Sequence, residues 1–249
     1  MPHRAPHRRG LTPQGRGRFP GYDVLDEVER WDDVTAGVVL ARLSPVTDLS
    51  FFTMDEDAIA RPLCDLLLAQ DAEPRIPVVG LIDARLALGD TDGWHHDDMP
   101  EDGQAWRDSL AHLDADAARL FDEPFAGLDR DRQAALVQAV QDKAAASERW
   151  RGLPAAQVWS LWTRYACAAF YSHPWAWNEI GFGGPAYPRG YKNRHVAGRE
   201  PFEVADHDDV DPVPFASRVE RARDLHARLL AAGGDSAAGH SSGGEGQDA

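Results

Sequence analysis

Apolar residues recur at helical spacing along most of the chain. Between Trp106 and Leu120 they alternate steps of four and three, which places them on one face of a helix. A second dense pattern follows Pro154, a residue suited to the first turn of a helix, and its few polar positions predict a helix central to the core. A last amphipathic helix is expected over 215–230, whereas 37–43 is the best strand candidate. The patterns predict a mainly α fold of about five to six helices with long irregular segments.

Local signals indicate where several of these helices begin or change direction. Thr53 and Glu56 form a capping-box pair just before a run of apolar positions. Pro62 lies within that run, so we expect a kink or a break near residue 61. Residues 77–88 predict a second helix, and Asp129 is placed to cap another one further along the chain.

Composition and charge narrow the classes of partner. Hydrophobic residues make up 43% and charged residues 27%, with a formal net charge of -15. This balance is typical of globular proteins, and the negative charge argues against nucleic acid or an anionic membrane surface as the main partner. No apolar run approaches the roughly 18 residues needed to span a bilayer, so direct membrane insertion is not expected. We therefore expect a soluble chain. A cytoplasmic location is expected because no apolar segment follows Arg8-Arg9.

The two ends of the chain differ in composition from its middle. The first residues hold several arginines and no acids, whereas the last are rich in Gly and Ser, and both compositions are typical of disorder. Arg8-Arg9 resembles the start of a twin-arginine export signal, but no apolar segment follows, so export with a partner is left only as an alternative. The predicted organisation is a disordered basic arm (1–22), a helical domain (23–205), an acidic linker with a C-terminal helix (206–231) and a disordered tail (232–249).

Two cysteines, Cys64 and Cys167, stand among apolar neighbours about a hundred positions apart. The sequence contains neither a CxxC pair, as in zinc ribbons, nor the CxxCH motif that attaches c-type haem. We expect two reduced, buried thiols, with a disulfide between them left open.

The segment 171–191 concentrates aromatic residues on a backbone interrupted by glycines and prolines. Long irregular segments with large rings are often functional, and Trp and Tyr dominate interface hot spots. The alternative is that these rings cap the chain's own core. The candidate interaction residues are His173, Pro174, Trp175, Trp177, Asn178, Glu179, Phe182, Gly183, Gly184, Pro185 and Tyr187.

Three patterns suggest chemistry without the context that the chemistry requires. Gly181 to Ala186 matches a dinucleotide fingerprint, yet prolines obstruct the helix that should follow. His173 and Glu179 could act as a base and its orienting carboxylate, although a His before Pro is more often a turn residue. The acidic segment 90–98 holds His and Asp ligand types but follows neither a calcium-loop nor a zinc-site pattern. We predict no catalytic, cofactor-binding or metal-binding residue in this chain.

Several short motifs, taken in order, resemble the gluconate 2-dehydrogenase subunit 3 family over about residues 30–205. Most are weak singly, whereas the run from Tyr171 to Pro185 is specific. The motifs are Phe51-Phe52-Thr53, Leu63-Cys64-Asp65, Pro77-Val78-Val79 leading to Leu81-Ile82-Asp83, Asp98-Met99-Pro100, Phe125-Ala126-Gly127-Leu128, and Tyr171-Ser172-His173-Pro174-Trp175-Ala176-Trp177-Asn178-Glu179-Ile180-Gly181-Phe182-Gly183-Gly184-Pro185.

The resemblance implies a small helical subunit of a bacterial dehydrogenase complex. In that family a large glucose–methanol–choline type subunit holds FAD and substrate, and a cytochrome subunit can pass electrons onward. The chain is then expected to carry no cofactor and to bind, stabilise or mature a flavin-dependent sugar or alcohol dehydrogenase. The alternatives are a free-standing carbohydrate-active enzyme using His173 and Glu179, and a transient export or maturation chaperone.

Overall fold

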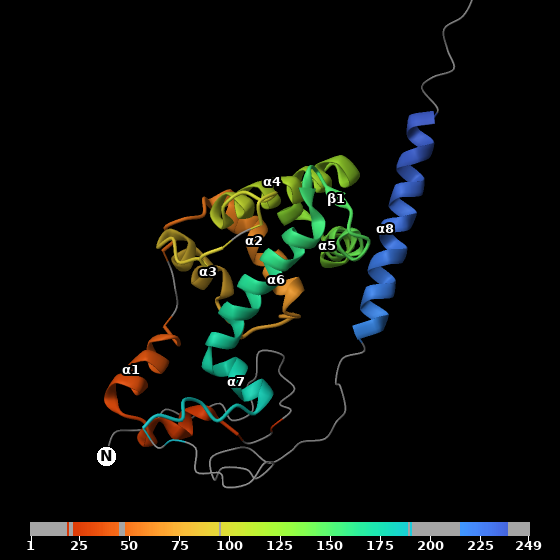
Figure 1. Ribbon diagram of the computed structural model, residues 1–249. Coiled ribbons are helices and arrows are strands. Elements are labelled where there is room, and N and C mark those ends of the chain that lie inside the picture. The colour runs from red at the N-terminus through yellow and green to blue at the C-terminus, as the bar shows by residue number, and fades with distance from the viewer. Residues whose placement is uncertain are drawn as a thin grey trace, which may run out of the picture. The chain divides into compact units, whose positions relative to one another are not determined.

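The computed structural model describes residues 19, 22–44, 48–94, 96–188, 190 and 215–238 (Figure 1). Nearly all of the predicted N-terminal arm, the acidic linker before the last helix and the end of the Gly/Ser-rich tail lie outside these residues. The predicted domain boundary at 205/206 also falls outside them, so it stays a prediction.

The described chain is mainly helical, which confirms the predicted fold class. Its eight α-helices exceed the predicted five to six. The helical elements are η1 (Val24–Arg30), α1 (Asp33–Ala41), α2 (Met54–Leu67), α3 (Val78–Ala87), α4 (Asp102–Phe121), η2 (Phe125–Gly127), α5 (Arg130–Ala145), α6 (Ala155–Ser172), α7 (Pro174–Ile180) and α8 (Phe215–Ala238). Two short antiparallel strands, β1 (Arg149–Trp150) and β2 (Leu153–Pro154), pair Arg149 with Pro154 and Trp150 with Leu153.

The chain divides into two compact units, each assembled from separate segments of sequence. The segments Met1–Phe51, Cys64–Asp90 and Thr163–Pro212 make up the first unit. The segments Phe52–Leu63, Thr91–Trp162 and Val213–Ala249 make up the second. Both α2 and α6 contribute residues to each unit, because the boundaries at 63 and 162 fall inside these helices.

The core of the second unit follows the predicted apolar pattern of α4. Trp106, Leu110, Leu113 and Ala117 are all fully buried, as their four-and-three spacing predicted. Trp162 of α6 is also fully buried, and its indole Nε1 donates to the hydroxyl of Ser109, 2.9 Å away. Burying these large rings contributes apolar stabilisation to this unit.

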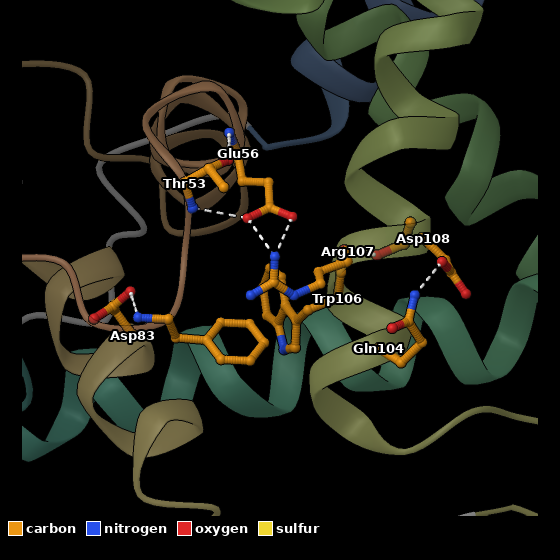
Figure 2. Close-up of polar contacts among 9 residues, drawn as sticks. Thr53, Glu56, Asp83, Gln104, Trp106, Arg107 and Asp108 are labelled. Atoms are coloured by element: carbon orange, nitrogen blue, oxygen red, sulfur yellow. Dashed lines mark hydrogen bonds and ion pairs between the residues drawn. The ribbon is translucent and has the colours of Figure 1, made fainter.

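The predicted capping box opens α2 and extends into an ion pair (Figure 2). The backbone N–H of Thr53 donates to Glu56 Oε2 at 2.8 Å, and the N–H of Glu56 donates to Thr53 Oγ1 at 3.2 Å. Arg107 of α4 donates to both carboxylate oxygens of Glu56, at 2.9 and 3.0 Å. One carboxylate therefore caps α2 and joins it to α4 within the second unit.

We predicted a kink or a break near residue 61. Pro62 does not interrupt α2, so the break is wrong, and the kink stays a prediction. The helix continues from Met54 to Leu67 with the proline inside it. A proline in a helix interior costs about 3 kcal/mol. The residues on either side of it, Ala60, Leu63 and Cys64, are almost completely buried. Their packing outweighs the lost backbone hydrogen bond.

The strand candidate at 37–43 is also wrong, because most of it belongs to the helix α1. Asp32 caps this helix by accepting from the N–H groups of Val34 and Thr35, at 2.9 and 3.0 Å. The valines of α1 favour a strand by propensity, but the cap and the burial of Val39 favour the helix.

The two cysteines are free, as expected, but they differ in exposure. Cys64 of α2 is buried, whereas Cys167 of α6 is exposed. The expectation that both thiols are buried is therefore wrong for Cys167, which lies on the solvent side of the helix despite its apolar neighbours in sequence.

Candidate functional site

The segment that follows α6 begins with a short, tightly capped helix. We predicted an irregular backbone after Ser172, but Pro174 occupies the first turn of α7, where a proline is tolerated. His173 is the N-cap, and its ring nitrogen Nδ1 accepts from the N–H of Trp175 at 3.2 Å. Gly181 closes the helix in the left-handed conformation, with φ of 66°. Trp175 and Trp177 therefore stand on a regular helix, whereas Phe182 and Tyr187 follow it on an irregular backbone, as predicted.

Trp177 faces the core of the first unit. It forms a buried cluster with Val24, Trp31 and Val39, which come from η1, its C-cap and α1. Its indole Nε1 donates to the carbonyl of Tyr171 at 2.7 Å. The guanidinium of Arg42 lies over the ring, 5.8 Å from its centre. The side chain of Trp177 therefore holds α1 and α7 together.

Two further candidate residues join the segment to η1. The side chain of Asn178 accepts from the N–H of Val24 at 2.8 Å and donates to Asp23 at 3.3 Å. Gly184 has a positive φ of 74°, and a Cβ added there would lie 2.5 Å from Trp31 Cζ2. Only glycine lets the backbone approach the indole this closely.

The structure thus separates the candidate interaction residues by exposure. Phe182 and Tyr187 are exposed, and so are Tyr171 and Ile180, which were not among the candidates. Their exposure depends on how α7 and the residues around it meet η1, and no local pattern gives that. His173, Pro174, Trp177, Asn178, Gly183 and Gly184 are buried, whereas Trp175, Glu179 and Pro185 are half-buried.

His173 lies in an environment that keeps its imidazole neutral. The ring is almost fully buried, and burial together with the positive charge of Arg42 lowers its pKa from 6.5 to about 4. A neutral ring leaves Nδ1 free to accept the capping hydrogen bond from Trp175, whereas the imidazolium would present a donor there. A base of such low pKa is poorly matched to proton transfer near pH 7.

This pKa predicts a pH-dependent contribution to stability. Because the folded state disfavours the protonated ring, the contribution is complete above the unfolded pKa of about 6.5 and is lost as pH falls towards 4. The loss should reach about 3 kcal/mol. His173→Asn, which keeps a capping acceptor but cannot titrate, should flatten this part of the profile when urea unfolding is measured between about pH 7 and pH 4.

The exposed His96 provides the matched control for this measurement. His96→Asn makes the same substitution at an exposed histidine, so it shows how much of any change in unfolding comes from the substitution itself. Equal slopes for the wild type and His173→Asn would contradict the buried, neutral state of His173.

The other patterns with possible chemistry are placed as follows. A helix, not a strand, precedes Gly181, so the fingerprint lacks the strand–turn–helix order of a dinucleotide site. In the acidic segment 90–98, the ring of exposed Trp94 meets the edge of His96 with centres 5.4 Å apart, and His95 lies outside the described residues. No group of three His, Cys, Asp or Glu side chains able to hold a metal ion occurs among the residues that the structure describes. None of the helices described combines the length and apolar character needed to cross a bilayer.

Comparison with known proteins identifies the family. No curated protein and no solved structure gives a significant match to the chain. The family model described as gluconate 2-dehydrogenase subunit 3 matches residues 54–184. This match covers more than half of the 249 residues, from the start of α2 to Gly184, and leaves η1, α1 and α8 outside. The chain therefore belongs to the gluconate 2-dehydrogenase subunit 3 family.

Proposed function

We propose that this chain is a non-catalytic small subunit that binds a larger flavin-dependent sugar or alcohol dehydrogenase and stabilises or matures it. In this proposal the large subunit is of the glucose–methanol–choline type and holds the FAD, while this chain holds no cofactor. Membership of a family defined as a dehydrogenase subunit supports the proposal directly. In this proposal a cytochrome subunit can join the complex as a third member.

The observation that carries the proposal is a set of exposed apolar side chains on a pinned backbone. Tyr171, Ile180, Phe182 and Tyr187 are exposed, although each is large and at least partly apolar. The caps of α7 and the contacts of Asn178 and Gly184 hold the segment that carries them. Aromatic side chains on a backbone that is already ordered lose little entropy on binding, which suits them as anchors of an interface.

The experiment that tests the proposal is co-expression with candidate flavoproteins of the large-subunit type. Size-exclusion chromatography should show both chains in one peak, and that peak should absorb as a bound flavin. A chain that elutes alone as a dispersed monomer with every candidate would overturn the proposal. If the chain binds the immature flavoprotein but is missing from the mature enzyme, it acts as a maturation chaperone and not as a subunit.

Variants of the exposed rings test where the partner binds. Phe182→Ser combined with Tyr187→Ser should weaken the affinity for the flavoprotein at least about tenfold, because each aromatic anchor buried in an interface contributes about 2 kcal/mol. Leu88→Ser provides the control, since Leu88 is 84% exposed at the end of α3. Both variants should keep the circular dichroism spectrum of the wild type. The ring of Phe182 meets that of Trp177 with centres 5.4 Å apart, so Tyr187→Ser alone is the variant that should also keep the melting temperature. Unchanged binding in the double variant would remove these rings from the interface.

A further inference from the structure

The helix α1 exposes several apolar residues that do not pack into the core of the chain. Val39 is the buried residue of this nine-residue helix. Val34, Val38 and Leu40 are 75%, 52% and 43% exposed. Single exposed apolar residues are ordinary, but Val34 and Val38 lie one turn apart on the same side of the helix, and a continuous exposed apolar face often marks an interface.

The exposed residues follow one helical line. Val34, Gly37, Val38 and Ala41 are spaced i, i+3, i+4 and i+7, so they lie on one face, and all four are exposed. A Cβ added to Gly37 would meet nothing within 4 Å, so the chain's own packing does not require a glycine there. Glycine weakens a helix interior relative to alanine, whereas a small residue between two valines lets a second backbone approach closely.

The contacts of α1 hold this face in a fixed orientation. Asp32 caps the helix through two backbone N–H groups and also accepts from the hydroxyl of Thr35 at 2.9 Å. Val39 packs in the cluster with Trp31 and Trp177, and Arg42 donates to the carbonyl of Ser172 at 2.9 Å. The face is therefore ordered before any partner binds, which favours docking.

Charges around the face indicate the chemistry of its partner. Residues 22–44 contain six acids but only two basic residues, Arg30 and Arg42. Arg30 pairs with Glu27 at 3.3 Å, and Arg42 is engaged with Ser172 and Trp177. The exposed acids Asp26, Glu29 and Asp33 lie before or at the first turn of α1. A second copy of this chain, with its net charge of -15, would bring like charges together, whereas a basic rim would complement them.

We infer that the face of α1 formed by Val34, Gly37, Val38 and Ala41 is a second docking surface, which takes an apolar helix with a Lys- or Arg-rich flank from the dehydrogenase subunit. This inference rests on the proposed function. It adds a docking surface that lies outside the region matched by the family model. The family match begins at residue 54, so α1 lies outside the shared part of the fold.

Gly37→Leu tests the inference in the full-length chain co-expressed with its flavoprotein. Leucine should stabilise the exposed helix, so the melting temperature should stay the same or rise. The same side chain should block close approach and weaken binding at least about tenfold. Ala118→Leu adds an exposed leucine on α4 and should leave binding unchanged. Loss of binding in a variant that is no less stable cannot be explained by a merely structural role of α1.

The remaining outcomes separate this inference from the proposed function. A wild-type chain that never co-elutes with a flavoprotein removes the proposed function and this inference together. A wild-type complex that forms equally well with Gly37→Leu and with Val34→Ser combined with Val38→Ser removes the docking surface alone. A wild-type dimer that Gly37→Leu dissociates, measured by light scattering without partner, would assign the face to a second copy and overturn the inference. Affinity for the flavoprotein should fall as NaCl rises from about 0.05 M to about 0.5 M, because salt screens the acidic rim.

Discussion

Trp162→Ala is expected to lower the free energy of unfolding by about 3–5 kcal/mol, the usual effect of truncating a buried tryptophan. The side chain is completely buried in the second unit. It meets Trp150 edge-on, with ring centres 5.6 Å apart, and donates to Ser109. The substitution therefore removes a large apolar surface, leaves a cavity and deletes one buried hydrogen bond.

Urea unfolding followed by far-ultraviolet circular dichroism measures this effect. Trp94→Ala is the matched control, because it removes the same side chain from a position that is 58% exposed. The control should change the free energy of unfolding by less than about 1 kcal/mol. A loss of similar size in the two variants would contradict the central place of Trp162 in the core.

Gly184→Ala is expected to cost about 2–5 kcal/mol, the second large effect. A positive φ of 74° is strained for alanine by about 1–2 kcal/mol, and the new Cβ would lie within 2.5 Å of Trp31 Cζ2 and 3.0 Å of Val24 Cγ2. Relieving that overlap requires a shift of the buried indole, which adds about 1–3 kcal/mol. Hydrogen exchange should also show weaker protection in η1 and α1, since both contribute to the Trp31 cluster.

Gly89→Ala separates the backbone strain from the overlap. Gly89 has a similar φ of 64°, but a Cβ there would meet nothing within 4 Å. This control should lose only the strain contribution of about 1–2 kcal/mol and keep the protection of η1 and α1. If the two variants are equally stable, the close approach of Gly184 to Trp31 is not a feature of the folded protein.

The parts of the fold that could be predicted are those governed by local signals. The capping box of Thr53 and Glu56 and the cap at Asp129 depend on side chains within three residues of the helix start. The pattern of α4 is long enough to show its buried face without help from the rest of the chain. In each case the energy that decides the structure comes from neighbours in sequence.

The errors occurred where distant contacts outweigh local preference. Packing keeps α2 continuous through Pro62, and α7 begins with a histidine, an unusual cap, before a proline that we read as a helix breaker. Distant contacts also decide which of the candidate interaction residues are exposed. Asn178 meets Val24 across 154 residues, so no local pattern shows that Trp177 is buried while Phe182, whose ring meets Trp177, stays partly exposed. The valine-rich pattern of α1 fits a strand equally well.

Exposed Cys167 makes the unmodified chain suitable for site-specific labelling. The chain has two cysteines, and the other, Cys64, is buried, so a thiol-reactive fluorophore should attach at one position without engineering. Partial burial raises the pKa of the Cys167 thiol, so the reaction is faster in mildly alkaline buffer. The label would stand one helical turn from Tyr171, next to the exposed side chains proposed to meet the flavoprotein. A dye at this position can report on complex formation in solution while every side chain of the proposed interfaces keeps its native identity.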